Sequence, residues 1–214
     1  MRSWILIAAT LVVLVPAETT SAGKYNPERN IGDPAPVWKD LPGTDGKTHS
    51  LADLKDKEAI VVVVTCNTCP YAVEYEDRII EFAKKHAGEK SKIAVVALSV
   101  NTREEADLLP AMKERAKEKK FPFAYLFDAS QKIGRAFGAT RTPEFFVLDK
   151  QRKIIYMGAM DDSTDPKKVT KNYVELAVQA ALAGKKPETE ETVAIGCGVR
   201  YERKSRARRR KKTK

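Results

Sequence analysis

The chain has few residues of the kinds that cross-link proteins or bind metals: three cysteines and two histidines among 214 residues. Three cysteines are too few, and odd in number, for a structural disulfide framework. A structural zinc site needs four ligands, and one Cys-x-x-Cys pair, a distant Cys197, His49 and His86 do not supply a recognisable set. Covalent haem attachment requires a histidine directly after the second cysteine of the pair, where this chain has Pro70. We therefore expect no metal and no cofactor, and cysteines that perform chemistry.

Long apolar runs are also missing. The longest, residues 4–15, covers about twelve positions, whereas a membrane-spanning helix needs roughly 20 residues. Arg2 precedes this run, and two patterns of small residues suited to cleavage follow it, at 15–17 and 20–22. Residues 1–22 are therefore predicted to be a signal peptide, with an uncleaved membrane anchor as the alternative. We expect an exported protein, periplasmic or extracellular, without a lipid-modified cysteine.

Acidic residues are almost absent from the C-terminus. The chain carries a net charge of +10, of which residues 200–214 supply +9, from ten Lys and Arg against one Glu. Such a segment is predicted to be a disordered basic tail, because it has too little apolar surface to fold. An anionic membrane or polysaccharide surface is its expected partner, with a solvated tail that has no partner as the alternative. Nucleic acid is disfavoured, because an exported protein rarely meets it.

The segments between the termini predict one α/β domain. Residues 23–30 are expected to form a polar linker and residues 31–199 the domain. β-branched and apolar runs predict strands, and apolar residues at helical spacing predict helices. The strands are expected at 60–65, 92–100, 123–128, 144–149 and 153–160, and the helices at 71–86, 103–120 (interrupted at Pro110), 130–139 and 166–183. The last two strands form a hairpin across a short turn, which predicts a mixed sheet with an antiparallel edge, flanked by helices.

Two of the three cysteines stand where a buried strand is expected to give way to a helix. Functional groups of open α/β sheets gather at such carboxyl ends of strands. Cys66 is expected beside the helix N-terminus, where free N–H groups stabilise a thiolate. Cys69, one turn later, is close enough to resolve a mixed disulfide, and Pro70 suits the first helical turn. A purely structural Cys66–Cys69 disulfide would close too small a loop to stabilise the fold much. The pair therefore predicts thiol–disulfide chemistry.

Several motifs carry a resemblance to a known family. They are "GDPAP" at 32–36, "SLADLKDK" at 50–57, the apolar strand with the cysteine pair, and "GATRTPEFFVLD" at 138–149. Over roughly residues 31–185 the chain resembles the redoxins, which include the alkyl hydroperoxide reductase/thiol-specific antioxidant (AhpC/TSA), or peroxiredoxin-like, proteins. It looks closest to an exported branch with a Cys-x-x-Cys motif. The resemblance implies a thioredoxin-like fold.

The resemblance also implies roles for individual residues. Cys66 becomes the attacking thiol and Cys69 the resolving one. Thr142 and Pro143 match a loop whose proline is cis and faces the cysteines, although an ordinary turn proline is the alternative. In that loop the backbone of Thr142 is expected to pair with an extended segment of a protein partner. A protein disulfide or dithiol is then the expected substrate, together with a second redox partner.

The chain departs from true peroxiredoxins at the positions that matter for peroxide. Aligned on Cys69, the expected Thr or Ser is replaced by Cys66 and the expected proline by Val62. The arginine expected to stabilise the leaving oxygen falls near Pro143, with Arg141 close in sequence. Thiol–disulfide exchange is therefore favoured over a thiol peroxidase. A non-catalytic adaptor held to an anionic surface by the basic tail is a third alternative.

Three further residues are candidates for accessory roles. Glu144 and Glu74 could act as bases, although each is more simply read as a surface carboxylate. Cys197, between two glycines, is the odd cysteine and suggests intermolecular pairing or a reactive thiol. It could relay a disulfide by reaching Cys66 or Cys69, or it could be a tail cysteine without a role.

Overall fold

The computed structural model describes residues 23–86, 88 and 90–202. The predicted signal peptide, 1–22, and positions 203–214 of the predicted basic tail lie outside the described residues. Within the described ranges, no helix combines the length and the apolar character needed to cross a bilayer.

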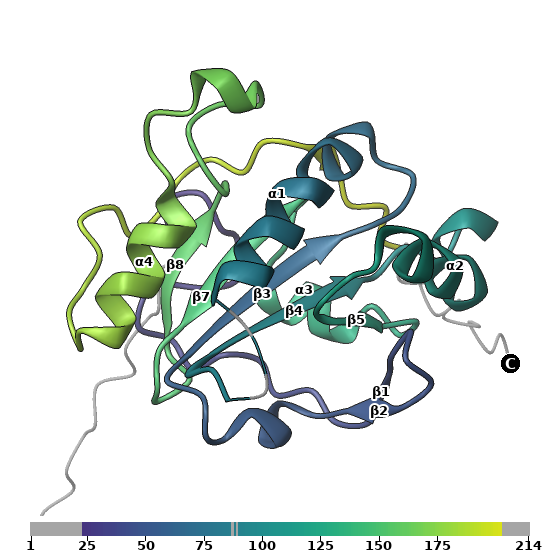
Figure 1. Cartoon of the computed structure of the whole chain (residues 1–214), viewed down its shortest axis with the longest axis horizontal. Helices are drawn as coiled ribbons and strands as arrows, with labels where there is room; N and C mark the ends of the chain where they lie inside the picture. Colours follow the sequence, from purple (N-terminus) through teal and green to yellow (C-terminus); the bar gives the residue numbers. More distant parts are fainter. Residues whose placement is uncertain (1–22, 87, 89, 203–214) are drawn as a thin grey trace, which may run out of the picture.

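A five-stranded mixed sheet forms the centre of the molecule, with the strand order β5-β4-β3-β7-β8 (Figure 1). The central β3 pairs in parallel with β4 and antiparallel with β7. The strands are β3 (Ala59–Thr65), β4 (Ile93–Ser99), β5 (Ala124–Phe127), β7 (Glu144–Leu148) and β8 (Ile154–Gly158). The predicted thioredoxin-like α/β fold, with parallel strands and an antiparallel C-terminal hairpin, is confirmed.

Helices cover both faces of this sheet. They are α1 (Pro70–His86), α2 (Leu109–Lys119), α3 (Lys132–Phe137) and α4 (Tyr173–Leu182), with short 3-10 turns η1 (Leu51–Leu54), η2 (Glu105–Asp107) and η3 (Pro166–Lys168). Helices α1 and α4 lie side by side on the near face in Figure 1, while α3 lies behind the sheet.

The continuous apolar run of β3 follows from these two layers. Val62 and its neighbours at alternate positions pack on one face with Trp38 and with Phe137 of α3. Val61 and Val63 pack on the other face against α1 and α4. Because both faces of the strand are covered, no polar position interrupts the run. Full burial of each such branched side chain contributes about 1.5–3 kcal/mol, so the strand that leads to the cysteines is firmly held.

Two predicted helices begin later than expected. The charged stretch 103–120 is not one helix interrupted at Pro110, because η2 comes first and α2 then begins at Leu109 with Pro110 in its first turn. Proline is tolerated there, since the first turn leaves its N–H groups without partners in the helix. Likewise, the helix expected from residue 166 is split into η3 and α4, which begins at Tyr173.

Residues 23–30 are not a free linker, which corrects the expectation from their polar composition. Asn26 is buried, and its side chain donates to the carbonyl of Phe137 and accepts from the N–H groups of Glu28 and Arg29. The Arg29 guanidinium donates to the carbonyl of Ala136. The segment is therefore part of the folded body.

Three residues of the predicted basic tail are likewise attached to the domain. Arg200 forms an ion pair with Glu104 at 2.6 Å, and the Arg135 guanidinium stacks on the ring of Tyr201. The N–H of Glu202 donates to the Gln131 side chain. The polypeptide thus follows the domain surface to residue 202.

Two small two-stranded sheets accompany the main one. The first, β1 (Leu41–Pro42) with β2 (Thr48–His49), lies in the N-terminal segment. The second joins β6 (Arg141–Thr142) to β9 (Cys197–Gly198). This second pairing brings the C-terminal part of the chain, yellow in Figure 1, back across the molecule toward the start of α1.

The anchoring of residues 23–30 can be tested with Asn26→Ala. The substitution leaves a buried carbonyl and two N–H groups without their partner, so we expect a loss of about 1–3 kcal/mol in the free energy of unfolding. Urea denaturation gives this value. Lys39→Ala, which removes only an exposed ion pair with Asp40, is the control and should change it by less than about 0.5 kcal/mol. Equal stability of the two variants would mean that the segment is not anchored.

Candidate active site

The cysteine pair lies at the carboxyl end of β3. Thr65 is the last residue of the strand, and α1 begins at Pro70. The carbonyl of Cys69 accepts the N–H of Val73, so Cys69 is the residue that caps the helix. Cys66 and Cys69 are 3% and 4% exposed, and both are free thiols. The expected junction of a buried strand and a helix is present, with Cys69 rather than Cys66 at the helix N-terminus.

The loop at Thr142 and Pro143 faces these thiols. The Thr142–Pro143 peptide bond is cis, as the resemblance implies. The Sγ of Cys66 lies 3.7 Å from the Thr142 hydroxyl, and the Sγ of Cys69 lies 3.0 Å from the Thr142 carbonyl oxygen. Thr142 therefore contacts both sulfurs, one with its side chain and one with its backbone.

The third cysteine completes the cluster. Cys197 packs against the buried group formed by Cys66, Cys69 and Ala72. It reaches this position because β9 pairs antiparallel with β6, which places Cys197 opposite Thr142. Of the accessory roles considered for Cys197, the structure favours one that involves the other two thiols. The pairing edge of Thr142, expected to receive a partner segment, is occupied by the chain itself.

Several hydrogen-bond donors are directed at the sulfur of Cys69. Burial opposes ionisation of this thiol, but hydrogen bonds from the Cys197 thiol and the Thr142 side chain outweigh burial. The N–H of Ala72, in the first turn of α1, adds a further donor. Together they lower the pKa of Cys69 below the ordinary value for a thiol. The Sγ of Cys69 also donates to the Thr142 carbonyl at 3.0 Å, a bond that the protonated thiol makes.

The surroundings of the other two thiols raise their pKa values instead. Burial raises the pKa of Cys66, and the negative charge of Asp107 raises it further. The hydrogen bond to Cys69, followed by burial, raises the pKa of Cys197 to about 11. The lowered pKa thus falls on Cys69, whereas the resemblance gives the attacking role to Cys66.

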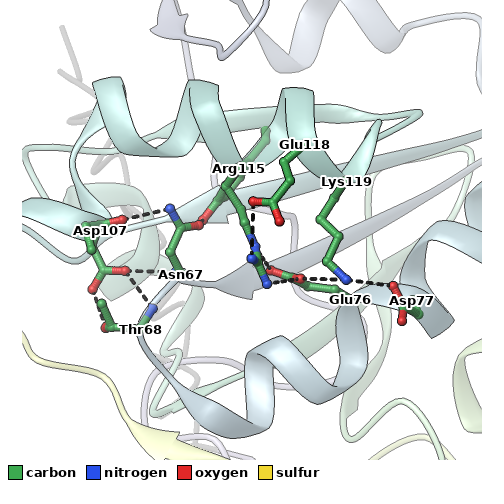
Figure 2. A network of polar contacts seen from close by, with 10 residues as sticks. Asn67, Thr68, Glu76, Asp77, Asp107, Arg115, Glu118 and Lys119 are labelled. Atoms are coloured by element: carbon green, nitrogen blue, oxygen red, sulfur yellow. Dashed lines mark hydrogen bonds and ion pairs between the residues drawn. The ribbon is translucent and has the colours of Figure 1, made fainter.

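Asp107 is the functional residue that the sequence did not reveal. It follows β4 in η2 and is fully buried. One carboxylate oxygen accepts the N–H groups of Asn67 and Thr68 at 2.8 and 3.0 Å, and the other accepts the Thr68 hydroxyl at 2.6 Å and the Asn101 amide at 3.0 Å. Figure 2 shows this carboxylate beside the two residues that separate the cysteines.

A second polar cluster joins the same helices further along. The Arg115 guanidinium on α2 donates two hydrogen bonds, at 3.0 and 2.6 Å, to the buried carboxylate of Glu76 on α1. Lys119 bridges the carboxylates of Glu76 and Asp77 (Figure 2). A bidentate pair of this kind fixes both the distance and the angle between its partners. Helix α2 is thus tied to α1 close to the cysteine loop.

Of the remaining candidates, Glu144 and Arg141 flank the cis-proline bond, and Glu74 lies on α1. Glu144 is buried rather than a surface carboxylate, and one of its oxygens accepts the N–H groups of Thr140 and Arg141 at 2.7 and 2.9 Å. Burial raises the pKa of Glu144. The exposed Arg141 directs its guanidinium to the carbonyl of Gly196. Glu74 is exposed, as expected.

The described ranges hold no cluster of three or more His, Cys, Asp or Glu side chains arranged to bind a metal ion. Each histidine has a carboxylate partner away from the cysteines. His49 contacts Asp45 at 3.0 Å, and His86 contacts Glu175 at 2.6 Å.

The fold and the site together define a thioredoxin-like protein with a thiol cluster at the end of its central strand. Residues 30–174 match the family model described as Redoxin. This is more than half of the chain, which therefore belongs to the Redoxin family. No curated protein matches the chain.

Solved structures agree with this assignment. A hypothetical protein from Sinorhizobium meliloti 1021 is similar at 33% identity and a TM-score of 0.75, over 81% of this chain and 96% of that one. An uncharacterized conserved protein from Geobacillus kaustophilus is similar at 28% identity and a TM-score of 0.75, over 82% and 94%. A thiol:disulfide interchange protein of the thioredoxin family from Chlorobium tepidum TLS shares the fold at 24% identity and a TM-score of 0.52, over 64% and 91%.

The effect of Asp107 on Cys66 can be tested with Asp107→Asn. The amide removes the buried negative charge, so we expect the pKa of Cys66 to fall. The titration uses ultraviolet thiolate absorbance in a Cys69→Ser, Cys197→Ser background, where only Cys66 ionises as a thiol. Asp77→Asn, which alters an exposed carboxylate of the second polar cluster, should leave the pKa of Cys66 unchanged. An unaltered pKa in Asp107→Asn would show that this charge does not act on Cys66.

Proposed function

We propose that the protein is a thiol–disulfide oxidoreductase that exchanges disulfides with protein partners through Cys66 and Cys69. The observation that carries the proposal is the contact of both sulfurs with Thr142 of the cis-proline loop. Two thiols separated by two residues at the start of a helix can close into a disulfide. The backbone edge of the loop beside them suits an extended segment, and in this structure β9 of the same chain occupies it. Membership of the Redoxin family supports the same class of chemistry.

The exchange proceeds in two balanced steps. The Cys69 thiolate attacks one sulfur of a partner disulfide, so that a mixed disulfide forms and the partner's other sulfur leaves as a thiolate. Cys66 then loses its proton and attacks the Sγ of Cys69, which releases the partner's second thiolate and leaves the Cys66–Cys69 disulfide. The partner gains two electrons, and the reverse sequence oxidises a partner dithiol. We assign the attack to Cys69 because its environment favours the thiolate.

A thiol peroxidase is the second candidate function, and the lowered pKa of Cys69 favours it, since peroxide reacts with thiolates. The surroundings of Cys69 weigh against it. A leaving oxygen needs donors or a positive charge directed at it, whereas the Arg141 guanidinium is exposed and donates to the carbonyl of Gly196. Protein disulfide exchange is therefore the better-supported reaction.

The setting of this reaction is part of the proposal. The signal-peptide pattern in residues 1–22 supports export to the periplasm or the extracellular space. The basic run in 203–214 supports attachment to an anionic membrane or polysaccharide surface. A second redox protein would restore the oxidation state of the cysteine pair after each exchange.

Catalysis of protein disulfide reduction tests the proposed function. With dithiothreitol as the electron donor and insulin as the disulfide substrate, the protein should accelerate insulin reduction, measured by turbidity. Cys66→Ser and Cys69→Ser should each lose at least about 90% of the acceleration, because the pair acts as a unit. Glu74→Gln, on the exposed side of α1, is the matched control and should retain the activity. If both cysteine variants remain active, the proposed pair does not perform the exchange.

Stopped-flow oxidation by hydrogen peroxide separates the two candidate functions. We expect the reduced protein to lose its thiols no faster than an ordinary thiolate of the same pKa, because no placed cation receives the leaving oxygen. Tryptophan fluorescence and residual thiol content follow the reaction. A rate above that of the free thiolate by about a thousandfold or more would instead establish a peroxidase, given how much one preorganised donor contributes.

A further inference from the structure

The C-terminal segment, residues 191–202, crosses the cysteine site between two anchored ends. At its start, the Glu191 carboxylate accepts the N–H groups of three consecutive residues, 24–26, and the N–H of Thr192 donates to the carbonyl of Met157. At its end, Arg200 pairs with Glu104, and the N–H of Glu202 donates to Gln131. Between the anchors lies β9, with Cys197.

Close approach of this segment to the cis-proline loop depends on Gly196. A Cβ at this position would collide with the carbonyl of Thr142 and with the nitrogen of Pro143. A Cβ at Gly198, two residues later and at the end of β9, would meet open space. Since glycine alone permits the backbone to come this close, the sequence allows β9 to lie where an extended partner would otherwise pair with Thr142.

The three thiols differ in how accessible they are. Cys66 and Cys69 are nearly fully buried, and β9 is paired with β6 beside them. Cys197 is partly exposed, and Gly198 beside it is exposed. A partner protein that approaches this surface therefore meets Cys197 first.

We propose that Cys197 is a third exchange thiol, which accepts a disulfide from the buried pair through Cys69 and presents it to protein partners, while β9 occupies the partner-binding edge of Thr142. This inference rests on the proposed function, since it describes how the Cys66–Cys69 pair communicates with a partner.

The internal step balances without another reactant. In the oxidised protein, Cys197 loses its proton and its thiolate attacks the Sγ of Cys69, the Cys66–Cys69 bond breaks, and Cys66 leaves as a thiolate and takes up the proton. A protein dithiol then attacks Cys197 in the Cys69–Cys197 disulfide and releases Cys69. Its second thiol displaces Cys197 and closes the partner's disulfide, which leaves all three cysteines reduced. With a protein disulfide as the oxidant, the same steps run in reverse.

The redox state of Cys69 controls the reactivity of Cys197. In the reduced protein the hydrogen bond to Cys69 is the main cause that raises the pKa of Cys197 to about 11, so Cys197 remains a protonated donor. Once Cys69 joins a disulfide, it carries no thiolate to accept this bond, and the main cause of the raised pKa is gone. We therefore expect the pKa of Cys197 to be lower in the oxidised protein than in the reduced one.

Disulfide equilibria in the Cys66→Ser protein test the relay geometry, because only Cys69 and Cys197 can then pair within the chain. The full chain is equilibrated with reduced and oxidised glutathione, and the disulfides are mapped by mass spectrometry. We expect a Cys69–Cys197 disulfide whose effective concentration exceeds that of the urea-unfolded chain by about tenfold or more. No excess over the unfolded chain would overturn the proposal.

Two glycine variants of this protein form a matched pair. Gly196→Ala should lower the effective concentration about tenfold, equivalent to about 1.4 kcal/mol, because it pushes β9 away from Thr142. Gly198→Ala should leave it unchanged. Circular dichroism checks that both variants fold. Equal values for the two would mean that docking of β9 on the cis-proline loop does not bring the thiols together.

Cys197→Ser distinguishes failure of the relay from failure of the proposed function. We expect the Cys66–Cys69 disulfide still to form in glutathione, while oxidation of a reduced protein substrate slows by about tenfold or more relative to the unaltered protein. If Cys197→Ser forms the Cys66–Cys69 disulfide and oxidises the reduced protein substrate at an unaltered rate, the relay is rejected and the proposed function stands. Failure of the unaltered protein and of Cys197→Ser to form a Cys66–Cys69 disulfide would reject the proposed function itself.

Discussion

The Asp107 carboxylate is the interaction on which the geometry of the cysteine site depends. A buried carboxylate is costly unless donors surround it, and here the donors include the N–H groups of Asn67 and Thr68. These are the two residues between the cysteines, so the same hydrogen bonds stabilise the charge of Asp107 and fix the conformation of the loop. An apolar residue at position 107 would leave both N–H groups without a partner, and the distance between the two sulfurs would no longer be set.

The same charge decides how the thiols share ionisation. It raises the pKa of Cys66, which faces it, while the first turn of α1 and the neighbouring hydroxyl and thiol serve Cys69. A site held together by a carboxylate therefore directs the thiolate away from that carboxylate, to the sulfur that caps the helix. The Asp107 charge thus fixes the loop and also adds to burial in raising the pKa of Cys66.

Sequence patterns predict most of the fold and the centre of the site. They fail where the interacting residues are far apart in the sequence, or where the paired strands are only two residues long. The run at 60–65 and the hairpin at 144–160 are recognisable because burial on both faces leaves unbroken runs of apolar, β-branched residues. Asp107 lies in a charged stretch without a motif, about 40 residues from the loop it binds, so nothing local distinguishes it from a solvated carboxylate. The β6–β9 pairing involves two residues per strand, too few to produce any periodicity. Pro110 was misread as an interruption because proline suits a first helical turn as well as a break.

The small size of the β6–β9 pairing also determines what the site can do. Two residue pairs, the bond from Val199 to Thr140 and the bond from Arg141 to the Gly196 carbonyl hold the middle of the C-terminal segment on the loop, so its local release costs less than global unfolding. The anchors at Glu191 and Glu202 lie outside this stretch and remain in place when it opens. Local opening of this stretch would free Thr142 to pair with another strand, while the outer anchors would keep Cys197 tethered near Cys69 at a high effective concentration. An internal strand that is weakly paired but firmly tethered allows the site to alternate between its own thiol and that of a partner without disturbing the sheet beneath it.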